Sequence, residues 1–439
     1  MAMVVKNNLS AKNTLNQLNK NEKATAKDLK KLASGMKINS AADDASGYAI
    51  SDRMDVQLRS LEQDNQNAQN GSALLRTAEG AVSSTVDILR TLKEKVINAA
   101  NDSNTDEDRA TIQKELNQAV DQLEDNANVT YNGQQLIDGS QNSTVLSPGT
   151  CTTFVNQSLE MGTDSYNTPL TDMNERNGNS LGIHVGDTIT VAYVQNGETA
   201  THSQVVGEDT VMQDLFYGWD KMIIGAAYNA DNPSYIGQNQ YGEEVYTADG
   251  KDAVVYQAAF PGLEHQVSGL TFQVTRSDGT VNKTASGKLD EFREVIRAQD
   301  PSPDNSISFQ VGTRANQTVR IGLTDMRPTA LGLRATDGST LNIRTQVSAR
   351  AAINVLDNAL EKALDEQTKI GSVTSRLGYT SSNIVTSSEN TQSSMSVIRD
   401  ADMASTMTDY TKNNVLTQAA QSMLAQANQS SSSVLSLLQ

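Results

Sequence analysis

The sequence is poor in the residues that cross-link or fill a small compact protein. One cysteine, Cys151, among 439 residues excludes any intramolecular disulfide. Aromatic residues make up 4% of the chain and hydrophobic residues 37%, so much of the apolar surface must be buried as narrow stripes on helices. No apolar run approaches the roughly 18 residues of a membrane span. We therefore expect stability from helix packing or from assembly, and no membrane insertion.

Positive charge is scarce as well. The chain has 35 basic and 52 acidic residues, a formal net charge of −17. A nucleic-acid-binding protein would carry a basic patch, and an anionic membrane surface would repel this chain. The sequence therefore predicts no nucleic-acid partner.

The residues of a catalytic or metal centre are few and scattered. His184, His202 and His265 stand in no H-E-x-x-H pattern, and one cysteine cannot build a thiolate zinc site. Cys151 has no base next to it in the sequence, which favours an unreactive thiol. The acidic run 102–108 does not have EF-hand spacing. We expect no enzyme activity, cofactor or metal.

The first 140 residues have helical patterns. Residues 8–34 contain no Pro or Gly, and Gly35 is placed to end a helix there. Ser40, with Asp43 three residues on, predicts the N-cap of a second helix. After a loop over 101–107, Ile112, Leu116, Ala119 and Leu123 predict a third amphipathic helix that ends near the turn pair Asn132-Gly133.

The second helix and a helix near the C-terminus carry matching apolar seams. Their apolar residues recur at alternating steps of three and four, the spacing of a heptad repeat. The first seam includes Leu58, Leu61, Leu75, Val82, Val86, Leu89 and Val96, and the second includes Ile353, Leu356, Leu360, Ile370 and Leu377. This spacing predicts long paired helices in a coiled-coil-like bundle.

Between residues 140 and 334 the pattern changes to short β-prone runs. Strands are predicted over 187–193, followed by the hairpin turn Asn196-Gly197, and over 270–275, 306–311 and 317–323. One helix is predicted over 211–228, with Trp219 in the core. The fold class is therefore mainly α at both termini with a central β-rich α+β insert.

Both ends of the chain resemble bacterial flagellin. Residues 32–54, LASGMKINSAADDASGYAISDRM, resemble the signature "LSSGxRINSAxDDAAGLAISxRM". Residues 398–404, IRDADMA, are similar to "RIxDADxA", and MLAQANQ at 423–429 with VLSLL at 434–438 resembles that family's C-terminal sequence. The resemblance covers roughly 1–140 and 305–439.

This resemblance implies a subunit that polymerises into a flagellar filament for swimming motility. It implies that residues 1–43 and 395–439 form the filament core, residues 44–140 and 305–394 an inner shell, and residues 141–304 an outward-facing domain. The interface expected from the terminal apolar residues comprises Leu9, Leu15, Leu18, Leu29, Leu32, Met403, Met407, Tyr410, Leu416, Met423, Leu435 and Leu438.

The resemblance also implies partners and a location. The partners are the same chain, flagellar cap and hook-associated proteins, and an export chaperone. The chain is expected outside the cell, exported through the flagellum's own type III channel. The N-terminus lacks the apolar run of about 7–15 residues of a cleaved signal peptide, as this route requires.

Three alternatives remain beside a filament subunit. The apolar stripes alone also fit an ordinary helical bundle. A hook–filament junction protein would share the terminal helices but join filaments instead of propagating them. An enzyme carried on the same scaffold would need catalytic geometry in the insert.

Two further surface roles follow from the resemblance. The animal Toll-like flagellin receptor binds a segment resembling "LQRIRELAVQ", here LRTLKEKVIN at 89–98. Leu89 and Glu94 match, but Thr91, after Arg90, replaces the central arginine, whose bidentate fork threonine lacks. We expect weak recognition. Flagellins are often O-glycosylated on outward surfaces, and composition offers Thr144, Ser147, Thr152 and Thr153 as acceptors.

Overall fold

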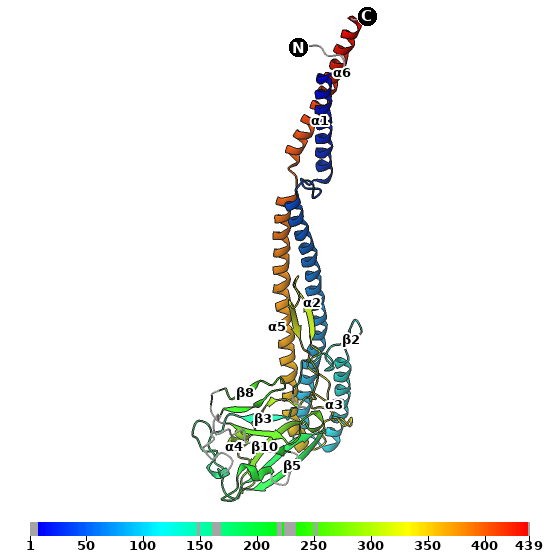
Figure 1. Ribbon diagram of the computed structural model, residues 1–439. Helices are drawn as coiled ribbons and strands as arrows, with labels where there is room; N and C mark the ends of the chain where they lie inside the picture. The colour runs from blue at the N-terminus through cyan, green and yellow to red at the C-terminus, as the bar shows by residue number, and fades with distance from the viewer. Residues whose placement is uncertain are drawn as a thin grey trace. The chain divides into compact units, whose positions relative to one another are not determined.

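The structure is a computed structural model that describes residues 8–146, 150–159, 168–216, 222–223, 234–248, 250 and 253–437. The chain divides into two compact units. Unit 1 comprises residues 1–68, 310–317 and 379–439, and unit 2 comprises 69–309 and 318–378. The three-part division expected above stays a prediction. Figure 1 shows the order of the elements along the chain.

In unit 1 the first helix, α1 (Leu9–Ser34), begins and ends where the sequence predicts. The Asn8 side chain accepts a hydrogen bond from the N–H of Ala11, which caps the N-terminus. Gly35, with φ of 71°, donates its N–H to the carbonyl of Lys31. A left-handed residue at this position favours glycine, and it ends the helix.

The last helix, α6 (Met403–Leu437), lies antiparallel beside α1, as Figure 1 shows. Asn8 Nδ2 donates to the carbonyl of Ala427 at 3.2 Å, and Asn413 Nδ2 donates to Asp28 Oδ2 at 2.7 Å. The residue numbers rise along one helix as they fall along the other. The two terminal segments therefore form a helical pair.

Three long helices supply most of the described α structure of unit 2. The long helices α2 (Ala45–Ala99) and α5 (Gln346–Arg399) each run through both units, and α3 (Asp106–Ala127) lies wholly in unit 2. Thr105 and Asp108 form a complete capping box at the start of α3. The acidic run 102–108 thus serves a helix N-terminus, where negative charge is favourable.

The described strands of the insert form several small sheets. Sheet β10-β4-β5 consists of β4 (Thr188–Gln195), β5 (Glu198–Val205) and β10 (Val267–Thr275), all antiparallel. Sheet β11-β3-β9-β6 consists of β3 (Thr153–Asn156), β6 (Met222–Ile223), β9 (Val254–Ala258) and β11 (Arg293–Ile296). The two-stranded pairs are β1 (Thr130–Tyr131) with β2 (Gln134–Gln135), β7 (Tyr235–Gln238) with β8 (Glu244–Tyr246), and β12 (Ile307–Gln310) with β13 (Thr318–Ile321).

A core joins the two larger sheets to the short helix α4 (Lys283–Leu289). Phe154 and Tyr256 from one sheet pack in the same cluster as Phe272 from the other and Leu289 from α4. The Tyr256 and Phe272 rings stack with centroids 6.1 Å apart. The β-rich insert therefore has its own hydrophobic core.

Most turn predictions are confirmed, and one helix prediction is wrong. Asn132, Gly133, Asn196 and Gly197 all have the positive φ that a tight hairpin turn requires. In the described part of the helix predicted over 211–228, the structure has instead a short 3-10 helix, η2 (Met212–Phe216), and strand β6, and residues 217–221 and 224–228 lie outside the described residues. Met212, Leu215 and Phe216 are buried in the core of the sheets. Their helix-like spacing therefore comes from a single buried turn and not from a long helix. Trp219 lies outside the described residues.

Candidate assembly interface

The helical pair of α1 and α6 has almost no interior. Among the described side chains of these two helices, only Leu18, Asn21 and Ala420 are buried. Two helices side by side can cover only one narrow stripe on each partner. The remaining apolar side chains must face solvent or another molecule.

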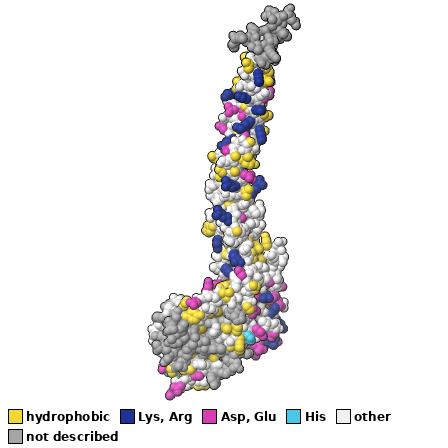
Figure 2. Space-filling model, in the orientation of Figure 1, with side chains coloured by type: hydrophobic (Ala, Val, Ile, Leu, Met, Phe, Trp, Pro, Cys, Tyr) yellow, Lys and Arg dark blue, Asp and Glu magenta, His cyan; other side chains and the backbone are white. Residues whose placement is uncertain are grey.

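Eight large apolar side chains of α1 and α6 are 42% to 68% exposed. They are Leu9, Leu15, Leu29, Met403, Met407, Val415, Leu416 and Met423. In Figure 2, yellow apolar side chains along the helices are interspersed with dark blue basic, magenta acidic and white polar ones. Two helices that cover only one another and leave eight large apolar side chains exposed are a candidate surface for association.

The remaining residues of the interface predicted from sequence behave differently. Leu32 and Tyr410 are half-buried, and Leu18 is buried between the helices. The side chain of Leu435 and all of Leu438 lie outside the described residues. The sequence reading missed Val415, which is 59% exposed and adjoins Leu416.

A short turn between α1 and α2 joins the ends of α5 and α6. Met36 forms an antiparallel bridge with Asp400. The N–H of Lys37 donates to the carbonyl of Arg399 at 2.8 Å. The N–H of Ala401 donates to the carbonyl of Gly35 at 2.9 Å. These backbone bonds join the connection between α1 and α2 to the connection between α5 and α6.

Asp43 holds this turn together. Its carboxylate accepts hydrogen bonds from the N–H of Asn39 and the hydroxyl of Ser40, both at 3.2 Å, and pairs with Lys27 at 3.1 Å. The hydrogen bond from Lys27, followed by that from Asn39, lowers the pKa of Asp43 to about 2. The carboxylate is therefore charged at neutral pH.

The N-cap predicted for Ser40 is wrong. The carboxylate of Asp44 accepts from the N–H groups of Ser46 and Gly47 at 3.1 and 3.0 Å, so Asp44 caps α2. A Cβ on Gly47 would lie 2.5 Å from the Asp44 carboxylate and 2.7 Å from Ile38. A larger residue there would require the Asp44 and Ile38 side chains to shift. The cap falls one turn later than Ser40.

The long helices bury most of the predicted seam. The fully buried members, each at most 2% exposed, are Leu75, Val82, Val86, Leu89, Val96, Leu356, Ile370 and Leu377. Leu61 is 8% exposed, whereas Leu58, Ile353 and Leu360 are half-buried. An ion pair of Lys93 on α2 with Asp357 on α5 adds a polar link in unit 2.

The receptor-like segment is only partly available on the surface. Leu89 is 1% exposed and belongs to the helical core. Arg90 is exposed and pairs with Asp87 at 3.2 Å, and Thr91 donates its hydroxyl to the carbonyl of Asp87. Thr91 and Glu94 are exposed. A partner could reach three of these four side chains.

Two of the four proposed sugar acceptors are wrong for the folded chain. Thr152 and Thr153 are 0% and 1% exposed. Thr153 donates its hydroxyl to the carbonyl of Cys151, and the Thr152 hydroxyl accepts from the N–H of Val267. Strand β3 is buried on both faces, so it shows no alternation that would reveal this in the sequence. Thr144 is half-buried, and Ser147 lies outside the described residues.

The structure offers little chemistry elsewhere. Within the described residues, no group of three or more His, Cys, Asp or Glu side chains could hold a metal ion. Burial raises the pKa of the half-buried Cys151 thiol. In the same residues, no helix combines the length and apolarity needed to cross a membrane.

Comparison with known proteins matches both helical ends. A family model for the bacterial flagellin N-terminal helical region matches residues 5–142, and one for the C-terminal helical region matches residues 353–438. A flagellin of Clostridium tyrobutyricum is 34% identical over 430 residues, covering 97% of this chain and 99% of the relative. A flagellin of Bacillus subtilis is 25% identical, covering 99% and 100%. A solved structure of FliC from Burkholderia pseudomallei is similar at 16% identity with a TM-score of 0.26, covering 70% of this chain and 99% of that chain.

Long helices at both ends of the chain and a central β-rich region place the protein in a flagellin-like fold class. The two family matches, and a relative 34% identical over nearly the full length, show that this chain belongs to the flagellin family. It is a structural subunit of the extracellular bacterial flagellar filament. Because flagellins match it from end to end, the hook–filament junction alternative is not favoured.

Proposed function

We propose that other copies of this chain cover the exposed apolar faces of α1 and α6, and that this burial drives filament growth. The observation that carries the proposal is the set of eight large apolar side chains left 42% to 68% exposed on a pair of helices with almost no interior. A second copy has the same exposed apolar side chains, so the terminal helices of two copies can pack against each other.

The available burial sets the expected strength of a contact. Full burial of a Leu-sized side chain is worth roughly 1.5–3 kcal/mol, and about half of each side chain is already covered, so the eight contribute about 6–12 kcal/mol. Association costs an estimated 4–15 kcal/mol. Terminal contacts alone therefore give marginal binding, and growth needs several neighbours to contact each new subunit.

Contacts that do not close into a ring generate an open helical polymer. In such a polymer we assign residues 1–43 and 395–439 to the core, and residues 44–140 and 305–394 to the surrounding shell. Residues 141–304 then face outward. Support comes from burial: the helical seam of unit 2 is already filled, whereas the terminal faces are not.

Seeded polymerisation tests this proposal. Purified monomer is added to short filament fragments and imaged by negative-stain electron microscopy, beside chains lacking residues 1–34 or 395–439. We expect long filaments from the intact chain alone. Elongation by a truncated chain at the rate of the intact one would show that the terminal helices are dispensable.

We also propose contacts with flagellar cap proteins, hook-associated proteins and an export chaperone, and export through the flagellum's own channel. The support is the apolar surface of the terminal helices, which needs cover before assembly. If a chaperone covers this surface, a protease should cut the monomer more slowly near Leu29 and Leu416 when the chaperone is present. Equal cleavage with and without the chaperone would contradict the proposal.

Activation of the Toll-like flagellin receptor should be weak. Leu89 is buried, and Thr91 cannot offer the two parallel hydrogen bonds of an arginine. A reporter-cell dose–response should lie well to the right of that of a flagellin that retains the arginine, and Thr91→Arg should shift it back. An unshifted response from the unaltered chain would refute the proposal.

We propose that the chain is not an enzyme and that Thr144 is the remaining glycan acceptor among the described candidates. The support is the lack, within the described residues, of a metal-binding group, and the half-buried position of Thr144. Hydrolysis of a protease substrate panel by purified filaments would contradict the first point. Mass spectrometry of native filaments checks the second, with Thr144→Val as the control.

A further inference from the structure

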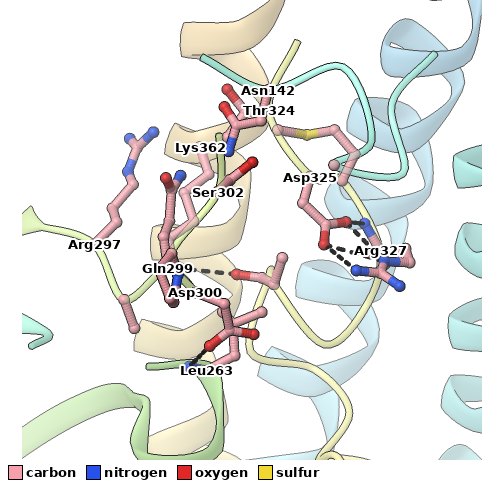
Figure 3. A pocket seen from close by; sticks show the side chains of 15 residues that line it. Asn142, Leu263, Arg297, Gln299, Asp300, Ser302, Thr324, Asp325, Arg327 and Lys362 are labelled. Atoms are coloured by element: carbon pink, nitrogen blue, oxygen red, sulfur yellow. Dashed lines mark hydrogen bonds and ion pairs between the residues drawn. The ribbon is translucent and has the colours of Figure 1, made fainter. Parts of the chain in front are cut away.

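A cavity of about 220 Å³ lies in unit 2, between the loop after β2, the segment after β11, the loop after β13 and helix α5. Figure 3 shows the side chains that line it. At about 30 Å³ for each molecule of liquid water, it has room for about seven waters. It is smaller than the roughly 300 Å³ at which drug-sized pockets begin. Its size suits a small molecule.

Besides Arg327, two basic side chains line the cavity, Lys362 and Arg297, and each is held by an acidic residue. Lys362 is 5% exposed, and its Nζ lies 3.1 Å from Glu294 Oε2. Burial and the nearby Arg297 lower the pKa of Lys362, with Glu294 opposing them. Arg297 pairs with Asp365 at 2.6 Å. Both positive charges are thus fixed in place before any ligand arrives.

Two carboxylates line the same cavity and are fixed equally well. Asp300 Oδ1 accepts from the N–H of Leu263 at 3.1 Å. Asp325 forms a bidentate pair with Arg327, with distances of 2.6 to 3.0 Å. These contacts are drawn as dashed lines in Figure 3. The wall therefore presents rigid groups of both signs.

Gln299 adds an acceptor that the protein does not satisfy. It is 8% exposed, and within the described part of the chain its Oε1 accepts no hydrogen bond. A buried acceptor without a donor is unfavourable, and the cavity beside it is where a donor can bind. The ligand must therefore bring at least one donor group.

We propose that this cavity binds a small, neutral, polyhydroxylated molecule the size of one monosaccharide. A simple anion would meet Asp300 and Asp325, and a simple cation would meet Lys362 and Arg297. A hydroxyl group donates and accepts, so several hydroxyls can satisfy a wall of mixed sign, including Gln299. The apolar side chains of Leu263 and Met326 offer surface for the C–H groups of such a ring.

The test uses the full-length monomer, so its result does not depend on polymerisation. Saturation-transfer NMR and calorimetry are run with glucose, galactose and mannose, and with glucuronate, glucosamine and inorganic phosphate as charged probes. We expect saturable binding of at least one neutral hexose with a millimolar dissociation constant, typical of so small a ligand. The charged probes should bind at least tenfold more weakly.

Three variants locate the site. Gln299→Leu removes the unsatisfied acceptor and should weaken hexose binding at least tenfold, while Gln134→Leu, on the exposed strand β2, should not. Asp300→Asn can keep the hydrogen bond from Leu263 and serves if Gln299→Leu fails to fold by circular dichroism. Three results would each overturn the proposal in favour of a water-filled cavity. They are tighter binding of a charged probe, unchanged hexose affinity in folded Gln299→Leu or Asp300→Asn, and no binding of any neutral hexose at 50-fold the expected dissociation constant.

Discussion

The helices of unit 2 bury their apolar seam inside one chain, whereas the terminal helices of unit 1 leave theirs exposed. Leu75, Val82 and Val96 are 0% exposed, yet Leu9 and Met423 are more than 60% exposed. The sequences of both regions show helical periodicity, so periodicity alone does not decide burial. The number of elements around each helix does, because α1 and α6 have only one another.

The two units also differ in charge. Unit 1 has 13 Lys and Arg against 12 Asp and Glu, a net charge of +1, which leaves −18 on unit 2. Subunits that approach through their near-neutral ends avoid most of the repulsion that a charge of −18 would create. Both differences favour association through unit 1, and each can be tested by substitution.

The largest effect should come from placing a charge on the exposed face of unit 1. Leu416→Glu would force a carboxylate into the apolar contact, at a cost of several kcal/mol. We expect the monomer concentration needed for seeded growth to rise more than 100-fold, measured by sedimentation. The matched control is Val205→Glu, a similarly exposed apolar residue of unit 2. If both variants polymerise equally, the comparison between the units fails.

Replacing a leucine by alanine should affect the stability of the monomer differently in the two units. Leu123 on α3 is 0% exposed, so Leu123→Ala should destabilise unit 2 by about 2–5 kcal/mol. Leu29→Ala, at a side chain that is 51% exposed, should change monomer stability by less than about 0.5 kcal/mol. Urea unfolding followed by circular dichroism measures both. A large loss from Leu29→Ala would mean that unit 1 has an interior of its own.

Asp290 makes the stability of unit 2 depend on pH. Burial raises its pKa from 3.8 to about 6, against hydrogen bonds that its Oδ1 accepts from the N–H of Phe272 and from Asn354 Nδ2. The folded state thus binds this proton more tightly than the unfolded chain does. The contribution is most favourable below pH 3.8 and falls by up to about 3 kcal/mol as pH rises to 6.

Asp290→Asn keeps an acceptor for Phe272 but cannot ionise. Relative to the unaltered chain, it should stabilise unit 2 by about 1–3 kcal/mol at pH 7.5 and by little at pH 4. The difference between the two urea midpoints isolates this group from the other carboxylates. An equal difference at both pH values would show that Asp290 does not titrate near 6.

The sequence predicted those elements whose cause is local. Gly35 ends α1, and the pairs Asn132-Gly133 and Asn196-Gly197 make tight turns because their backbones need positive φ. The heptad spacing predicted which faces of α2 and α5 are buried in unit 2. Each of these signals depends on a few adjacent residues or one helix face.

The sequence did not predict features that depend on contacts between segments far apart in the chain. Thr152 and Thr153 are polar and adjacent, yet both are buried, because sheet neighbours and Val267 cover both faces of β3. The cavity beside Gln299 is lined by segments that lie far apart in the chain, so no sequence pattern could predict it. Ser40 does not cap α2, because it lies in the turn held by Asp43 and Lys27, and Asp44 accepts from the first N–H groups of the helix.

The smallest predicted effect concerns the turn that joins the two helical pairs of unit 1. Hydrogen bonds from Lys27 and Asn39 lower the pKa of Asp43 below 3.8 to about 2, so its stabilising contribution is complete above pH 3.8 and is lost as pH falls through 2. Asp43→Asn should speed amide exchange of residues 36–48 at pH 7, whereas Asp52→Asn, an exposed carboxylate on α2, should not. Because the contacts of the Asp43 carboxylate are with Lys27, Asn39 and Ser40, the rest of the chain should exchange as before. Equal exchange in both variants would show that the backbone bonds of Lys37 and Ala401 hold this turn without the carboxylate.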